Sequence, residues 1–143
     1  MMKAIGTAAR GTRPARLAGS MLALLALTGP ALALMPPYVY ESARRDARSV
    51  IVLAVEGVEV PRREFGACTV SGTVRVVERG DAFTAGQKVQ IAVPCARKDA
   101  SPPIGGTIYQ PVETLTASRF GRAWLDADGK VVLSQYEQLA ALP

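Results

Sequence analysis

The side chains in this chain that are suited to catalysis are few. The sequence contains no histidine, which removes Ser-His-Asp and Cys-His catalysis and any zinc or copper site that uses histidine. Its two cysteines, Cys68 and Cys95, lack the C-x-x-C spacing that is typical of a reactive thiol pair. Any enzymatic activity would therefore depend on carboxylates or lysines.

The closely spaced carboxylates offer two candidate sites, and each has a simpler explanation. Asp126-x-Asp128-Gly129 resembles part of a calcium-binding loop, but it lacks the third acidic position and the closing glutamate. A tight hairpin turn uses the same Asp and Gly residues, so we predict a turn. Glu56 and Glu59 are expected to be solvated beside a strand end. The sequence thus predicts no metal, no cofactor and no enzymatic activity.

Aromatic side chains form a third candidate group. They could line a stacking surface for a ligand, although the apolar neighbours of Trp124 favour a place in the core. The residues are Tyr38, Tyr40, Tyr109, Tyr136 and Trp124.

Residues 1–33 have the organisation of a cleaved signal peptide. A basic start without acidic residues precedes the apolar run from Leu17 to Leu27, and Ala31-Leu32-Ala33 is a small-x-small cleavage pattern. The apolar run is too short to span a bilayer. We therefore predict cleavage between Ala33 and Leu34, a single domain over residues 34–143, a periplasmic or secreted location, and no stable membrane anchor.

The exported part is nearly neutral. Four of the 17 basic residues and none of the 12 acidic ones lie in residues 1–33, which leaves 13 basic against 12 acidic residues. Binding of nucleic acid depends on a basic surplus, so we expect no nucleic-acid partner. In an oxidising compartment, the cysteine pair predicts a Cys68–Cys95 disulfide.

Alternating hydrophobicity predicts a β-hairpin that carries both cysteines. Apolar residues occupy the even positions of Cys68 to Arg79 and the odd positions of Lys88 to Cys95, with a turn bounded by Gly80 and Gly86. Both cysteines therefore face inward. In one register Cys68 lies opposite Cys95; a shifted register with a bulge, at Gly72 for example, fits the turn better.

Further strands complete a small closed or nearly closed barrel. Ser49 to Val55 reads as a buried strand, and a second hairpin surrounds Asp126 to Gly129, from Arg119 to Leu125 and from Lys130 to Tyr136. Residues 41–48 and the tail 137–143 are expected to form short helical turns, and residues 108–116 a short strand or turn.

The order of these segments resembles the netrin-module and tissue-metalloproteinase-inhibitor superfamily, over about residues 46–137. The likeness is carried by Ala47 to Val55, Val74 to Gly80, Gly86 to Cys95 and Gly121 to Gly129. It implies a mainly β fold, an OB-like barrel of about five strands with a short helix. The eukaryotic inhibitors chelate the protease zinc through a mature N-terminal cysteine. Here the expected terminus is Leu34 and no cysteine precedes Cys68, so the resemblance implies the fold and not that activity.

The function expected from the sequence is an exported, non-enzymatic binding module for a protein or small ligand that the residues do not identify. A protease inhibitor-like protein and a carboxylate-dependent hydrolase are the alternatives, and the oligomeric state stays open. Because side chains fill a barrel of this size, binding is expected in two segments, the loop from Ser101 to Thr107 and the connection from Glu59 to Gly66.

Overall fold

The computed structural model describes Gly11 and residues 35–143, so the predicted signal peptide and its cleavage point between Ala33 and Leu34 lie outside the described residues. The elements are α1 (Pro37–Asp46), β1 (Ser49–Glu59), β2 (Phe65–Arg79), β3 (Lys88–Ala96), β4 (Gln110–Pro111), α2 (Val112–Ala117), β5 (Phe120–Leu125) and β6 (Val131–Leu139).

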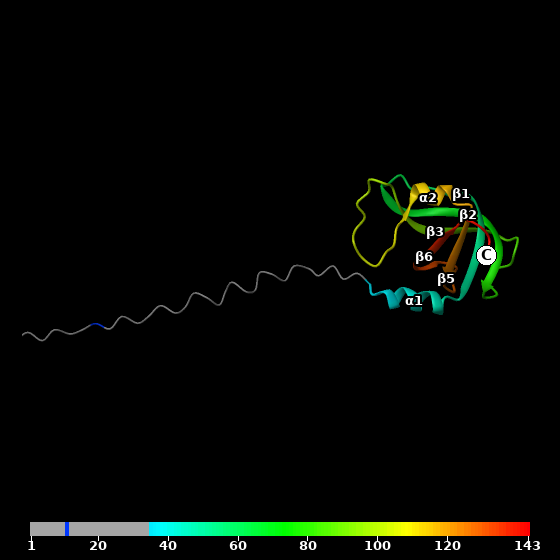
Figure 1. Cartoon of the computed structure of the whole chain (residues 1–143), viewed down its shortest axis with the longest axis horizontal. Helices are drawn as coiled ribbons and strands as arrows, with labels where there is room; N and C mark the ends of the chain where they lie inside the picture. The colour runs from blue at the N-terminus through cyan, green and yellow to red at the C-terminus, as the bar shows by residue number, and fades with distance from the viewer. Residues whose placement is uncertain (1–10, 12–34) are drawn as a thin grey trace, which may run out of the picture. The chain divides into compact units, whose positions relative to one another are not determined.

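The strands form one curled, half-barrel sheet in the order β4-β3-β2-β1-β5-β6 (Figure 1). All neighbours pair antiparallel except β3 and β4, which pair parallel through two residues each. The three-strand meander β1-β2-β3, the helix α2 and the hairpin β5-β6 follow one another along the chain, and β5 pairs with β1. The predicted fold class, a mainly β, OB-like barrel with a short helix, is confirmed.

The predicted first hairpin is present, with both cysteines on its inner face. Cys68 and Cys95 are fully buried and form a disulfide with a Cα–Cα distance of 5.7 Å. The hydrophobic parity is as predicted, but the register is not. Cys68 lies opposite Val93 and Cys95 opposite Gly66, so the disulfide joins diagonal neighbours rather than a directly opposed pair.

Gly72 lies at a close approach of β2 to β1, and not at a bulge in the β2–β3 pairing. A Cβ atom at this position would meet the carbonyl oxygen of Ala54 and the side chain of Leu53. The irregularities interrupt the β1–β2 pairing instead, at Val50/Ile51, Val52/Leu53 and Val55/Gly57. These irregularities bend the sheet, because a bulge adds local twist to a strand pair.

The helices and the C-terminal tail differ from the sequence predictions. The helix α1 begins at Pro37, because proline has a suitable φ angle for the first helical position and its missing N–H is not needed there. Residues 137–139 continue β6 instead of forming a helical turn. Within β6, Leu133 and Ser134 both have positive φ angles, which accompanies the bulge opposite Trp124.

Side chains close both ends of the barrel. Leu115 of α2 is fully buried at one end, and Phe83 of the β2–β3 turn packs against the core and beside Gly129 at the other. Along the open seam, the Gln110 side-chain amide donates to the Tyr136 carbonyl oxygen at 3.0 Å. Gln110 also accepts a hydrogen bond from Gln138 at 2.9 Å. Among the described residues, the inner face of the sheet is therefore occupied by packed core side chains.

The disulfide is expected to contribute strongly to stability. Replacing both cysteines with alanine should lower the free energy of unfolding by about 2–5 kcal/mol, because the reduced chain gains conformational freedom when unfolded. Urea denaturation monitored by circular dichroism would measure this loss. The oxidised protein should also show no free thiol after denaturation without reductant. Two reactive thiols under that condition would contradict the disulfide.

Tyr136 provides a test of the core. Its buried hydroxyl finds no hydrogen-bond partner within residues 35–143, and burial raises its pKa to about 12. At neutral pH, Tyr136→Phe should raise stability by roughly 1 kcal/mol, because a buried hydroxyl without a partner is lost. The unfolded state releases the tyrosine proton at about pH 10, whereas the folded state keeps it until about pH 12. Between these pH values the free energy of unfolding of the wild type should therefore fall, by at most about 3 kcal/mol. Tyr136→Phe has no such proton and should not show this fall. Parallel stability curves for the two proteins across this range would contradict the assignment.

Candidate interaction surface at the loop end

The β1–β2 connection, which lies within the segment Glu59 to Gly66 nominated from the sequence, is joined to the start of the loop that contains the nominated Ser101 to Thr107. Arg97 joins them, because its backbone N–H donates to the Glu64 carbonyl oxygen at 2.8 Å. Its guanidinium donates to the Pro61 carbonyl oxygen at 3.1 Å. The β1–β2 connection and the loop over residues 97–109 therefore form one surface at one end of the barrel.

The start of α1 completes this surface. The Tyr40 hydroxyl donates to the Gly106 carbonyl oxygen at 2.9 Å. The Met35 side chain packs on the same glycine, since a Cβ atom at Gly106 would lie 2.9 Å from the Met35 sulfur. We call this combined surface, made of the start of α1, the β1–β2 connection and the 97–109 loop, the loop end.

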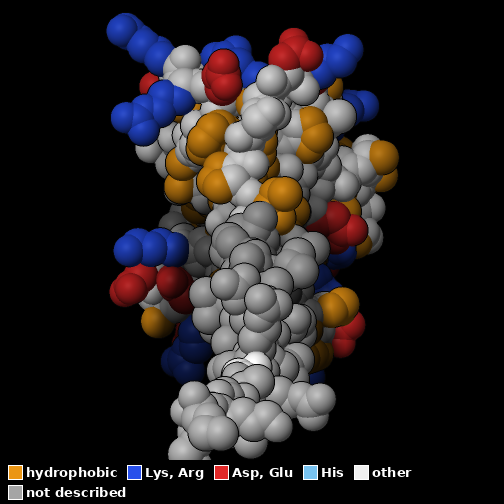
Figure 2. All heavy atoms as spheres, turned by 90° about the vertical axis from the view of Figure 1, so that its left-hand side faces the viewer, with side chains coloured by type: hydrophobic (Ala, Val, Ile, Leu, Met, Phe, Trp, Pro, Cys, Tyr) orange, Lys and Arg blue, Asp and Glu red, His pale blue; other side chains and the backbone are white. Residues whose placement is uncertain are grey.

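Large apolar side chains are exposed at the loop end. The most exposed are Tyr38 (66% exposed), Ile104 (64%), Ile108 (43%) and Met35 (39%). Figure 2 shows this face, with hydrophobic side chains near its middle and basic and acidic side chains at its upper rim. An apolar centre with a charged rim is typical of protein–protein interfaces.

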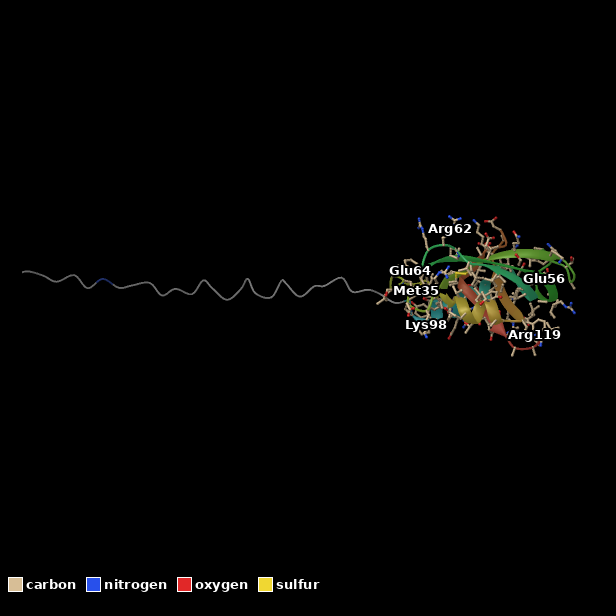
Figure 3. All side chains as sticks on the ribbon, turned by 90° about the horizontal axis from the view of Figure 1, so that it is seen from above. Met35, Glu56, Arg62, Glu64, Lys98 and Arg119 are labelled. Atoms are coloured by element: carbon tan, nitrogen blue, oxygen red, sulfur yellow. A yellow bond between two sulfur atoms is a disulfide. The ribbon has the colours of Figure 1, made fainter. Side chains whose placement is uncertain are left out.

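The charges around the loop end are of both signs. Figure 3 places Arg62, Glu64 and Lys98 at the same end as Met35, whereas Glu56 and Arg119 lie at the other end. A shallow hollow of about 280 Å³ beside the loop is lined by Glu64, Arg97, Lys98, Asp99, Ala100 and Glu113. The described charges at this rim are therefore mixed in sign.

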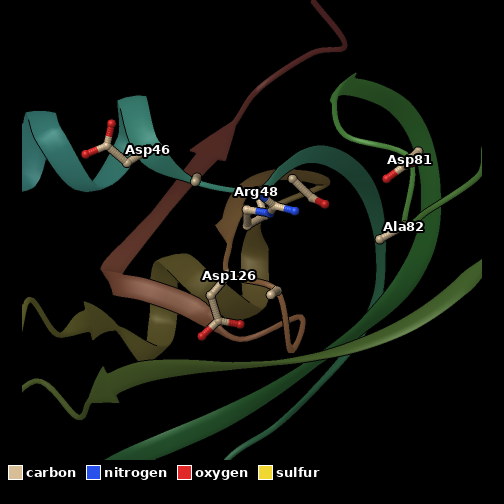
Figure 4. Close-up of a pocket in the computed structure, with 8 residues that line it drawn as sticks. Asp46, Arg48, Asp81, Ala82 and Asp126 are labelled. Atoms are coloured by element: carbon tan, nitrogen blue, oxygen red, sulfur yellow. The ribbon is translucent and has the colours of Figure 1, made fainter.

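The opposite end of the barrel carries a second hollow, of about 350 Å³, formed by the α1–β1 junction and the two hairpin turns. Figure 4 shows Arg48 among the carboxylates of Asp46, Asp81 and Asp126. Asp126 accepts backbone hydrogen bonds from Asp128 and Lys130, so the Asp126–Gly129 segment is the predicted hairpin turn. Among the described residues, no three acidic or cysteine side chains are arranged to hold a metal ion.

Glu56, the first of the two closely spaced glutamates, is paired with a lysine. Glu56 accepts a hydrogen bond from the Lys88 ammonium at 2.8 Å and another from Thr73. These contacts, with Lys88 contributing most, lower the pKa of Glu56. A general acid needs the opposite shift, a pKa raised by burial. Glu59 is exposed, as predicted.

Three of the five aromatic candidates, Tyr38, Tyr40 and Tyr109, belong to the loop end, where Tyr109 packs edge-on against Phe65. Tyr136 is in the core instead. The core position predicted for Trp124 is wrong. Its half-buried ring lies on the outer face of β5, with the guanidinium groups of Arg44 and Arg122 about 6 Å from its centroid, at 6.0 and 5.9 Å.

Sequence reasoning missed Met35 as part of the surface and named Tyr38 only among the aromatic candidates. The expected helical turns began at residue 41, so the proximity of the preceding residues to the loop was not foreseen. The signal available was Pro36-Pro37, since proline at the first helical position marks a helix start. Because the helix begins at Pro37, Met35 and Tyr40 lie beside Gly106 of the loop.

The hydrogen bond from Tyr40 provides a test of this arrangement. Tyr40→Phe should speed hydrogen exchange of the amides in residues 101–109, because the Gly106 carbonyl loses its anchor, while stability falls by only about 1 kcal/mol. Tyr38→Phe, which changes an exposed ring in the same helix, is the matched control and should leave the exchange unchanged. Equal exchange in both variants would show that the loop does not depend on this bond.

Comparison with known proteins assigns no family to the chain. No family model, no curated protein and no solved structure matches it. No helix within the described part of the chain is long and apolar enough to cross a membrane. The disulfide is typical of a protein outside the reducing cytoplasm. Any conclusion about function must therefore come from the residues and their geometry.

Proposed function

We propose that this protein is an exported, non-enzymatic interaction module that binds another protein through the loop end. The observation that carries the proposal is the set of exposed apolar side chains gathered there, on segments that hydrogen bonds hold in place. A solvent-exposed apolar group of this kind costs solubility unless a partner covers it. The predicted signal peptide and the disulfide support an exported location. The periplasm and the extracellular space are both reached by export and both allow disulfides to form.

The charge pattern favours a protein partner over a polyanion. Arg62, Arg63 and Lys98 lie beside Glu64 and Asp99 in the segments of the loop end. The acidic members oppose the attraction that the basic members would exert on anionic lipid or nucleic acid. A protein surface with an apolar centre and charges of both signs at its edge complements this pattern.

A photo-crosslinking amino acid in place of Tyr38, in the cells that make the protein, tests this function. Ile104→Asp and Ile108→Asp should each abolish a discrete crosslinked adduct, because a carboxylate would be desolvated at the apolar centre. Circular dichroism should be unchanged, since both side chains are exposed. Leu142→Asp is the matched control, because Leu142 is an equally exposed apolar residue of the C-terminal tail (41% exposed).

Two results would contradict the proposal. One is an adduct that persists in both isoleucine variants, which would place binding elsewhere. The other is turnover of a substrate that falls more than about a hundredfold when one carboxylate is changed to its amide, because such a loss is typical of a catalytic group.

A further inference from the structure

Met35 is the only methionine in residues 34–143; the other three are Met1, Met2 and Met21, ahead of the predicted cleavage point. The buried core is built mainly from valine, isoleucine, leucine and alanine, and it contains no methionine among the described residues. The single thioether of the exported part therefore lies at the surface, 39% exposed, in the apolar centre of the loop end.

The sulfur of Met35 is in direct contact with the loop. A Cβ atom built on Gly106 would lie 2.6 Å from the terminal methyl of Met35 and 2.9 Å from its sulfur, so the thioether packs against the glycine backbone itself. The same glycine accepts the hydrogen bond from Tyr40. Gly106 is thus held from two sides by the start of α1, and a chemical change at Met35 acts directly on the loop.

We propose that Met35 is an oxidation site through which peroxides control the loop end; the control of binding rests on the function proposed above, whereas the oxidation itself does not. The oxidant is a peroxide. Its O–O bond breaks, one oxygen atom forms an S–O bond with the Met35 sulfur, and the rest leaves as water or an alcohol. The sulfur loses two electrons and the peroxide gains them, so the reaction needs no further reactant.

The product changes the surface in two ways. The sulfoxide is polar, so it prefers water to the contact with Gly106. Gly106 then loses one of the two side-chain contacts described above, and the apolar centre loses one of its exposed members. Ile104 and Ile108 lie on the released loop, so oxidation alters the part of the surface on which binding depends. A methionine sulfoxide reductase reverses the change, because it restores the thioether.

Hydrogen exchange of the full chain, purified in its oxidised-disulfide form and treated with hydrogen peroxide, tests the proposal without a partner. Peptide mapping should show one added oxygen atom at Met35, gained nearly as fast as by free methionine. The amides of residues 101–109 should then exchange several-fold faster, while those of residues 51–53 in the core stay unchanged. Treatment with methionine sulfoxide reductase should restore the original exchange.

Two variants serve as controls. Met35→Leu keeps an apolar side chain of similar volume that peroxide cannot oxidise, so peroxide should leave its loop exchange unchanged. Met35→Gln imitates the polarity of the sulfoxide and should show fast loop exchange without peroxide. Resistance of Met35 to peroxide, or unchanged loop exchange after complete oxidation, would overturn the proposal. Failure to find a binding partner would contradict the proposed function alone, because the mass and exchange measurements do not involve a partner.

Discussion

The close approach of β1 to β2 at Gly72 is the constraint on which the rest of the structure depends. A side chain at this position would collide with the backbone of Ala54, so the two strands could not pair as they do. The bulges nearby bend β1. Residues 69–79 of β2 pair with β1, while residues 65–73 pair with β3, so one long strand holds both halves of the curled sheet together.

The curvature of the sheet limits which surfaces of the protein are available for binding. Once the sheet is curled, Leu115 and Phe83 close its two ends, and the disulfide braces the inner face of the first hairpin. The filled interior leaves the outer surface and the loops for recognition. Because α1 leads directly into β1, its own start lies beside the long loop after β3 (Figure 1). The loop end is therefore a consequence of how the barrel closes.

Local patterns predicted the parts of this fold that depend on local physics. Alternation placed Cys68 and Cys95 on one face and identified both hairpins, because the side chains of a strand alternate with a period of two. The register was beyond reach, because a shift of one strand by two residues keeps every side chain on the same face, so the alternation cannot distinguish such registers. Trp124 was placed in the core because its neighbours along the chain are apolar, whereas parity along β5 turns it outward, toward Arg44 of a distant helix.

Of the three segments that make up the loop end, the sequence nominated two, and their role in binding stays a prediction; the contribution from the start of α1 was not foreseen. Pairing between α1 and the loop is a contact between residues 66 positions apart, Tyr40 and Gly106, and no local pattern encodes it. The composition of the loop, rich in proline and glycine, indicated exposure but not that Ile104 and Ile108 would share a surface with Met35.

Methyl NMR of the isoleucines tests the central claim, that the loop end binds protein, most directly. Ile51 and Ile91 are buried in the core, whereas Ile104 and Ile108 are exposed at the loop end, so one labelling scheme supplies both probes and controls. In extract from the compartment that holds the protein, the account predicts that the Ile104 and Ile108 methyl signals broaden or shift, while the environments of the two core methyls are unchanged. The extract must contain the protein at its natural concentration or above. If the Ile104 and Ile108 signals in that extract match those in buffer, the claim that the loop end binds protein is contradicted.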